Sequence, residues 1–135
     1  MKNVKRLIAA IGMLLFINVA MFAGDAESNE ATFEEAMGFD QWVITESDEG
    51  ITVNLYLQIL DTEENTLSCI MELDYGILGT QELPCPGMYE VDEDNILSIG
   101  LPGSSIAYYI TSYLDGYIGL NEGTEYPESA LVRVE

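Results

Sequence analysis

The chain has 135 residues and a net charge of −20, because 24 acidic residues outnumber four basic ones. It contains no histidine, and after residue 6 its only base is Arg133. This composition excludes Ser-His-Asp and Cys-His catalysis, and the lack of lysine beyond Lys5 excludes Schiff-base chemistry and phosphate-binding loops there. The acidic charge also excludes nucleic acid and anionic membrane surfaces as partners, since both would repel the protein.

The N-terminal 23 residues have the pattern of a secretory signal peptide. Three bases precede an apolar run over Leu7–Phe22, and small residues follow that run. The run is shorter than the roughly 20 apolar residues that cross a bilayer. We therefore predict a signal peptide over residues 1–23, with cleavage after Ala23 or after Ala26. An uncleaved anchor and a buried core helix are the alternatives.

Export of this kind predicts a protein that works outside the cytoplasm, either in a periplasm or in the exterior. No later segment is long and apolar enough to span a membrane. The mature part, about 110 residues long, is sufficient for one domain with a hydrophobic core and too short for two.

Residues 24–37 form an acidic segment in which we expect a short helical turn. Thr32 and Glu35 have the spacing of a capping box, in which each side chain accepts a hydrogen bond from the backbone of the other residue. Gly38 is suited to end the turn in a left-handed conformation. An acidic tail without a helix is the alternative, and we expect Gly24–Ala31 to be mobile.

Residues 38–135 alternate between apolar and polar side chains, which is typical of strands with one buried face. Acidic residues, glycines and prolines separate these segments and indicate short turns. Short strands without intervening helices favour an all-β antiparallel meander that closes into a barrel, with a sandwich as the alternative. The expected strands are Trp42–Glu46, Ile51–Ile59, Leu67–Leu73, Met88–Val91, Ile96–Leu101, Ile106–Thr111, Tyr117–Leu120 and Ala130–Val134.

The chain has two cysteines, Cys69 and Cys85, and an oxidising compartment favours their pairing. They lie equally far before and after Ile77, the centre of a predicted hairpin, so they are expected to face each other across it. Pro84 and Pro86 flank the second cysteine and make its arm an edge or bulged strand. We predict a structural disulfide here, since two thiols without histidine make a poor metal site.

The second half of the chain resembles small bacterial lipocalin-like domains. The resemblance rests on the hairpin Gly87–Ile99 (GMYEVDEDNILSI), the tyrosine-led strand after it, the hairpin Leu114–Leu120 (LDGYIGL) and the terminal Leu131–Val134 (LVRV). Trp42 on the opening strand extends the similarity to roughly residues 38–135, although Gly38 is four residues before it, not two as in the family.

This resemblance implies an up-and-down barrel with an apolar interior, often with a small-molecule pocket and usually without catalysis. It also implies a contact between Arg133 on the last strand and Trp42 on the first. The alternation of the last strand indicates otherwise, because inward Val132 and Val134 would point Arg133 outward. Both arrangements remain open at this point.

Residues expected to face the barrel interior are candidates for lining a ligand cavity. They are Trp42, Val53, Leu55, Leu57, Leu67, Met71, Leu97, Ile99 and Tyr108. Such residues also fill the core of small barrels, so a filled barrel is the alternative. Tyr109 and Tyr117 are expected on the outer face, where they could contact a partner protein.

The acidic clusters Asp61–Glu64 and Asp92–Asp94 coincide with turns and match no calcium-loop motif, so we expect no dedicated metal site. We expect an exported, non-enzymatic, lipocalin-like β-barrel that has no cofactor and binds a small apolar ligand. The alternative is a secreted acidic interaction module with a filled core that docks a basic protein. A carboxylate pair for glycoside hydrolysis stays formally open. The sequence gives no indication of oligomeric state.

Overall fold

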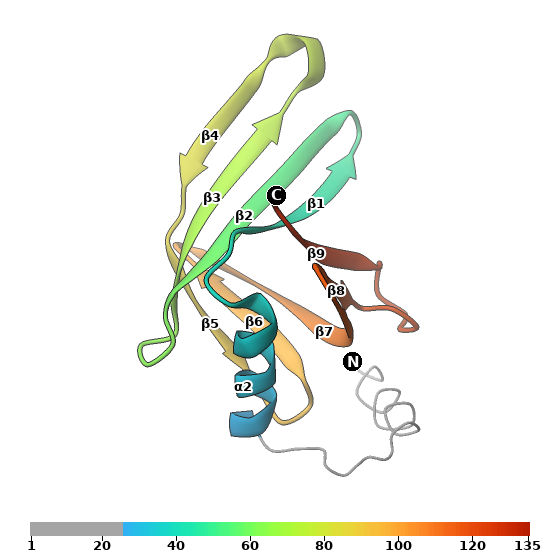
Figure 1. The fold of residues 1–135 in the computed structure, drawn as a ribbon. Coiled ribbons are helices and arrows are strands. Elements are labelled where there is room, and N and C mark those ends of the chain that lie inside the picture. Colours follow the sequence, from blue (N-terminus) through green and yellow to red (C-terminus); the bar gives the residue numbers. More distant parts are fainter. Residues whose placement is uncertain (1–25) are drawn as a thin grey trace.

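The computed structural model describes residues 26–135, and the predicted signal peptide and its first cleavage point lie outside them. Figure 1 shows one helix beside a strongly curved sheet. In chain order the elements are α2 (Ala26–Met37), β1 (Trp42–Asp48), β2 (Ile51–Asp61), β3 (Thr66–Asp74), the 3₁₀ turn η1 (Gly76–Leu78), β4 (Thr80–Pro84), β5 (Gly87–Val91), β6 (Ile96–Leu101), β7 (Ser104–Leu114), β8 (Tyr117–Leu120) and β9 (Ser129–Arg133).

Eight of these strands close into an antiparallel barrel. The strand order is β2-β1-β9-β8-β7-β6-β5-β3, and a further pairing of β3 with β2 completes the ring. β4 lies outside the ring and pairs only with β3. The predicted all-β meander with short connections is therefore confirmed, and the barrel, not the sandwich, is the observed form.

The alternation of the strands fills the end of the barrel nearest α2 with aliphatic side chains. Most of the aliphatic side chains there are at most 1% exposed, a degree of burial that excludes water from the core. They include Leu57, Ile59, Leu67, Leu97, Ile99, Ile118, Leu120 and Leu131.

Helix α2 covers this filled end of the barrel (Figure 1). Phe33 and Met37, one helical turn apart, are buried in the core, and the Phe33 ring lies 5.8 Å from that of Tyr89 on β5. Glu30 accepts a hydrogen bond from Asn65 Nδ2 at 2.9 Å, and the Tyr89 hydroxyl donates to Glu34. These contacts attach an acidic helix to the barrel end.

The expected capping box at Thr32 is wrong. The helix begins at Ala26, so Thr32 lies in its interior and its hydroxyl donates to the Ser28 carbonyl oxygen at 3.0 Å. Residues 26–31, expected to be mobile, are helical. The expected end of the helix is confirmed, since Gly38 has φ +59° and its N–H donates to the Glu34 carbonyl at 2.8 Å.

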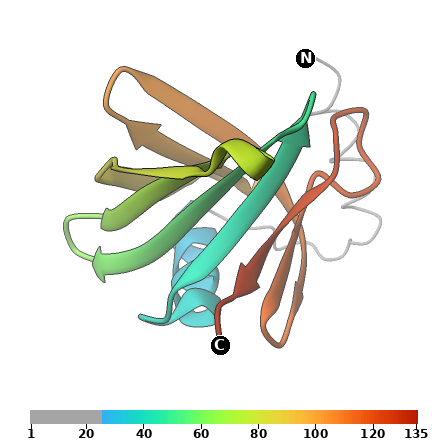
Figure 2. The same cartoon turned by 90° about the horizontal axis from the view of Figure 1, so that it is seen from above.

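The hairpins β1–β2 and β3–β4 extend beyond the filled end, on the side away from α2 (Figure 1). Figure 2 looks down on these hairpin tips, with α2 behind the strands at the far end. Strands β8 and β9 are much shorter: β9 pairs only with Trp42 and Val43 of β1, and β8 reaches only to Ile110 of β7. Within residues 26–135, no strand therefore lies between the part of β1 after Val43 and the part of β7 before Ile110.

Candidate functional site

The end of the barrel opposite α2 holds an open cavity of about 490 Å³. One wall comes from β1, β2 and β3, and the other from the β6–β7 turn and the start of β7. Its apolar lining consists mainly of Ile44, Val53, Leu55, Met71, Leu101 and Ile106. The barrel is thus filled at one end and hollow at the other.

The inner face of β1 changes from apolar to acidic along the strand. Trp42 and Ile44 are buried, whereas Glu46 and Asp48, the next two positions of the same alternation, are exposed and line the cavity. This strand therefore places two carboxylates at the mouth of a mainly apolar cavity.

The candidate ligand-lining residues divide between the cavity and the filled core. Val53, Leu55, Met71 and Tyr108 line the cavity. The remaining candidates are buried in the core beneath it, namely Trp42, Leu57, Leu67, Leu97 and Ile99. The sequence reasoning missed Ile44, Glu46 and Asp48, although continuing the inward alternation from Trp42 would have identified them.

A hydrogen bond between Tyr108 and Glu46 spans the place where the barrel wall lacks a strand. The Tyr108 hydroxyl donates to Glu46 Oε2 at 3.1 Å, and the two residues come from β7 and β1. Burial raises the pKa of Tyr108 above its ordinary value of 10.0, and the neighbouring Glu46 carboxylate raises it further. Tyr108 therefore remains a neutral donor near pH 7.

The two cysteines meet at the edge of the cavity, where Cys85 lines the cavity and Cys69 is buried in the core. Cys69 Sγ and Cys85 Sγ lie 2.7 Å apart, and the Cys85 N–H donates to the Cys69 carbonyl at 2.7 Å. The β3–β4 register pairs Ile70 with Pro84, which continues to Cys69 opposite Cys85, as the hairpin prediction requires. Burial raises the pKa of the Cys69 thiol, and contact with the second sulfur raises it further. The thiols are placed for oxidation to a disulfide, which itself stays a prediction.

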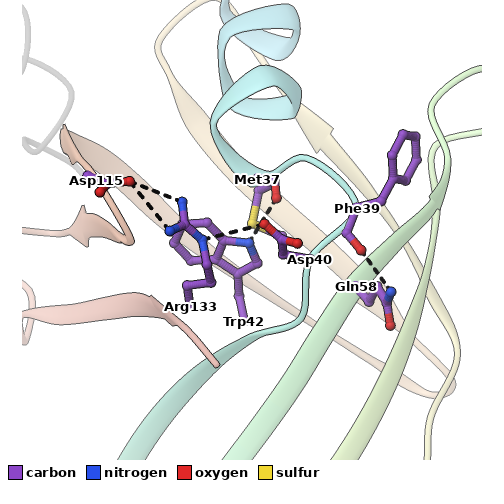
Figure 3. Close-up of polar contacts among 7 residues, drawn as sticks. All are labelled: Met37, Phe39, Asp40, Trp42, Gln58, Asp115 and Arg133. Atoms are coloured by element: carbon purple, nitrogen blue, oxygen red, sulfur yellow. Dashed lines mark hydrogen bonds and ion pairs between the residues drawn. The ribbon is translucent and has the colours of Figure 1, made fainter. Parts of the chain in front are cut away.

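Arg133 and Trp42 lie together beside α2, at the filled end (Figure 3). They are direct partners in the β1–β9 register, and Arg133 Cζ is 5.2 Å from the centroid of the Trp42 ring. The guanidinium also contacts Asp40 at 3.5 Å and Asp115 at 3.3 Å. Trp42 Nε1 donates to the Met37 carbonyl oxygen at 2.9 Å. The cluster joins the helix end, the first strand and the last strand.

The expected inward orientation of Val132 and Val134 is wrong. Val132 is 43% exposed, whereas Leu131 is fully buried and Arg133 shares the side of the strand on which Leu131 lies. Several consecutive apolar residues in this strand fit either face, and the pairing of Trp42 with Arg133 selects the face that buries Leu131.

The outer tyrosines do not form the exposed surface that the sequence suggested. Tyr109 is only 6% exposed, because the loop between β8 and β9 covers it and Tyr126 stacks on it at 6.4 Å between ring centroids. Asn121 in that loop accepts from the Tyr109 N–H at 2.9 Å. Tyr117 is half-buried, and its hydroxyl donates to Glu122 at 3.3 Å.

A second hollow, a surface groove of about 540 Å³, lies outside β7 under the β8–β9 loop. Glu46, Ile106 and Tyr108 line both this groove and the cavity. The two spaces therefore adjoin at the Tyr108–Glu46 hydrogen bond, where the wall between β1 and β7 is incomplete.

The acidic turn clusters serve as local backbone acceptors. Asp61 Oδ1 accepts from the Glu63 N–H at 2.8 Å, and Asp92 Oδ1 accepts from Asp94 and Ile96 N–H groups at 2.9 and 3.0 Å. Within residues 26–135 no group of three or more potential ligand side chains is arranged to hold a metal ion. In the same part of the chain, no helix has the length and hydropathy needed to cross a membrane.

No protein-family model matches the chain, and no curated protein is significantly similar to it. The functional interpretation therefore depends on the geometry of the barrel itself.

Proposed function

We propose that this protein is an exported, non-enzymatic, lipocalin-like barrel that binds a small apolar ligand in the cavity at its mouth. The observation that carries the proposal is the division of the barrel into a filled end and a hollow end. If the interior served only stability, inward side chains would be expected to fill it throughout. Here about 490 Å³ stays open, within the range typical of small-molecule sites.

The wall of the cavity suits an apolar ligand. Val53, Leu55 and Ile106 present branched aliphatic groups from opposite sides, and Met71 adds a flexible, polarisable side chain that adapts to ligand shape. A ligand that covers these groups removes apolar surface from water, at about 25 cal/mol per Å². At the filled end of the barrel, the Trp42–Arg133 contact and the position of helix α2 support the lipocalin-like assignment.

Fluorescence binding with N-phenyl-1-naphthylamine, a neutral apolar probe, tests the proposal. We expect saturable enhancement at about one site per chain. A Val53→Trp variant should fill the cavity and abolish the signal, whereas Thr52→Trp, on the outer face of the same strand, should keep it. A wild-type protein that gives no saturable signal, or a Val53→Trp variant that binds like Thr52→Trp, would contradict the proposal.

A further inference from the structure

The chemistry of the cavity mouth restricts the kind of ligand it accepts. Glu46 and Asp48 extend from the inner face of β1 into the cavity, above the apolar wall of Ile44 and Val53. Among residues 26–135, no basic side chain lines this space. A ligand in the cavity therefore meets apolar groups in its depth and carboxylates at its opening.

The Glu46 carboxylate is held in position and has no cationic partner within residues 26–135. Its Oε2 accepts from the Tyr108 hydroxyl, which fixes the side chain at the junction of cavity and outer groove. Arg133, the only base in this part of the chain, contacts Asp40 and Asp115 at the other end of the barrel. The charge of Glu46 is thus left for an external cation.

We propose that the cavity selects amphiphiles with an apolar body and a positively charged amine head, and that Glu46 receives the head while the cavity takes the body. This proposal rests on the proposed ligand-binding function. A carboxylate pairs with an ammonium group through a charge-assisted hydrogen bond, whereas it repels the head of a fatty acid anion. Ligands of the opposite charge are therefore disfavoured by the same residue.

The incomplete wall between β1 and β7 gives the head a suitable position. Glu46 and Tyr108 line both the cavity and the outer groove, so a head group beside them reaches solvent while the tail stays covered. A cation at this site keeps part of its hydration, which lowers the desolvation penalty that a fully buried ion pair would incur.

Displacement of N-phenyl-1-naphthylamine by three molecules of equal chain length tests this selectivity. Decylamine, decanol and decanoate carry a cationic, a neutral and an anionic head, and each is used below its micellar concentration in about 0.15 M salt. We expect decylamine to bind at least about tenfold more tightly than decanoate, with decanol between them. Equal affinities for the amine and the acid would overturn the proposal.

Two charge-neutralising variants separate a specific contact from general attraction to an acidic protein. Glu46→Gln should lower the affinity for decylamine about tenfold relative to the affinity of the same variant for decanol. Glu90→Gln, which removes the same charge from an exposed position on β5, should bind decylamine like the wild type. If both variants lower the affinity for decylamine equally, selection of the amine by Glu46 is refuted. Binding of the probe to the wild type would then still support the cavity as a ligand site. If the wild type does not bind the probe at all, the proposed function itself fails.

Discussion

Replacement of Arg133 by methionine should destabilise the barrel by about 1.5 kcal/mol. The Arg133 side chain is 30% exposed and contacts the Trp42 ring. The energy of this contact should therefore lie between those of fully exposed and fully desolvated cation–π pairs, at about 1 kcal/mol. Its ion pair with Asp40, which is 63% exposed, adds roughly 0.5 kcal/mol, and the pair with the nearly fully exposed Asp115 adds less. Methionine keeps much of the apolar packing on the indole while removing the charge.

Urea unfolding followed by circular dichroism measures this loss, with the cysteines held in one redox state and the m-value unchanged. Arg133→Lys is the matched control, because it keeps the charge but loses the flat face that stacks on the ring, and it should lose under 1 kcal/mol. In about 1 M salt the Debye length falls to about 3 Å, so the ion pairs should no longer contribute. The destabilisation caused by Arg133→Met should then fall to about 1 kcal/mol, the energy of the contact with the ring.

A double-mutant cycle isolates the contact itself. Trp42→Phe alone also removes the hydrogen bond from Nε1 to the Met37 carbonyl, so its single effect is larger than the stacking energy. The coupling between Trp42→Phe and Arg133→Met should nevertheless be about 1 kcal/mol. A coupling near zero, or an Arg133→Met variant as stable as the wild type, would refute the assignment of stability to this pair.

Three further outcomes are expected. Thiol titration of the exported protein in denaturant should detect neither Cys69 nor Cys85, and reduction should lower the free energy of unfolding by roughly 3 kcal/mol; two titrating thiols would contradict the disulfide. Burial raises the pKa values of Tyr89, Tyr108 and Tyr113 above 10, so these phenols should stay un-ionised in a native absorbance titration through pH 10–11. The unfolded chain loses those protons near pH 10, so stability should be fully present below that pH and fall as pH rises above it; a flat profile would exclude native burial. Raising the salt concentration at pH 8 should raise the melting temperature, since it screens repulsion among the carboxylates, and a fall would show that specific ion contacts dominate.

The strands were predictable because each buries one face. The alternation predicted the first and last residues of β6 and β8 correctly, and β1 and β2 extend only two residues beyond their predicted ends. The β3–β4 register followed from the symmetric placement of the cysteines about Ile77, which lies between two turn glycines. Local patterns were sufficient here because hairpin pairing is itself local.

The helix could not be predicted in full because its sequence is only weakly amphipathic. Phe33 and Met37 are its only buried residues, and the first turn contains no apolar side chain that contacts the core. Its position depends on contacts distant in sequence, such as those of Glu30 with Asn65 and of Asn29 Nδ2 with the Asp92 carbonyl at 2.9 Å. Such tertiary contacts leave no local signal.

The sequence also could not distinguish a filled barrel from a hollow one, since the same alternation fits both. The difference arises from strand length. β9 ends its pairing with β1 at Val43, so Ile44 and the residues after it have no β9 partner, and the bulge between Ile110 and Ser112 marks where β8 stops along β7. The hollow end is where the long hairpins continue and the short strands do not.

The distribution of charge makes the two ends of the barrel chemically different. At the end beside α2, the only base of residues 26–135 is held by Asp40 and Asp115, so part of the negative charge there is neutralised. At the mouth, Glu46 and Asp48 have no basic partner within the described residues, although they continue the same strand face that begins with Trp42. In the composition alone, Glu46 and Asp48 cannot be distinguished from the acidic residues that only make the surface soluble. The alternation of β1 shows that these two belong to the interior face, and a carboxylate that lines an apolar cavity without a base is best matched by a cation brought by the ligand.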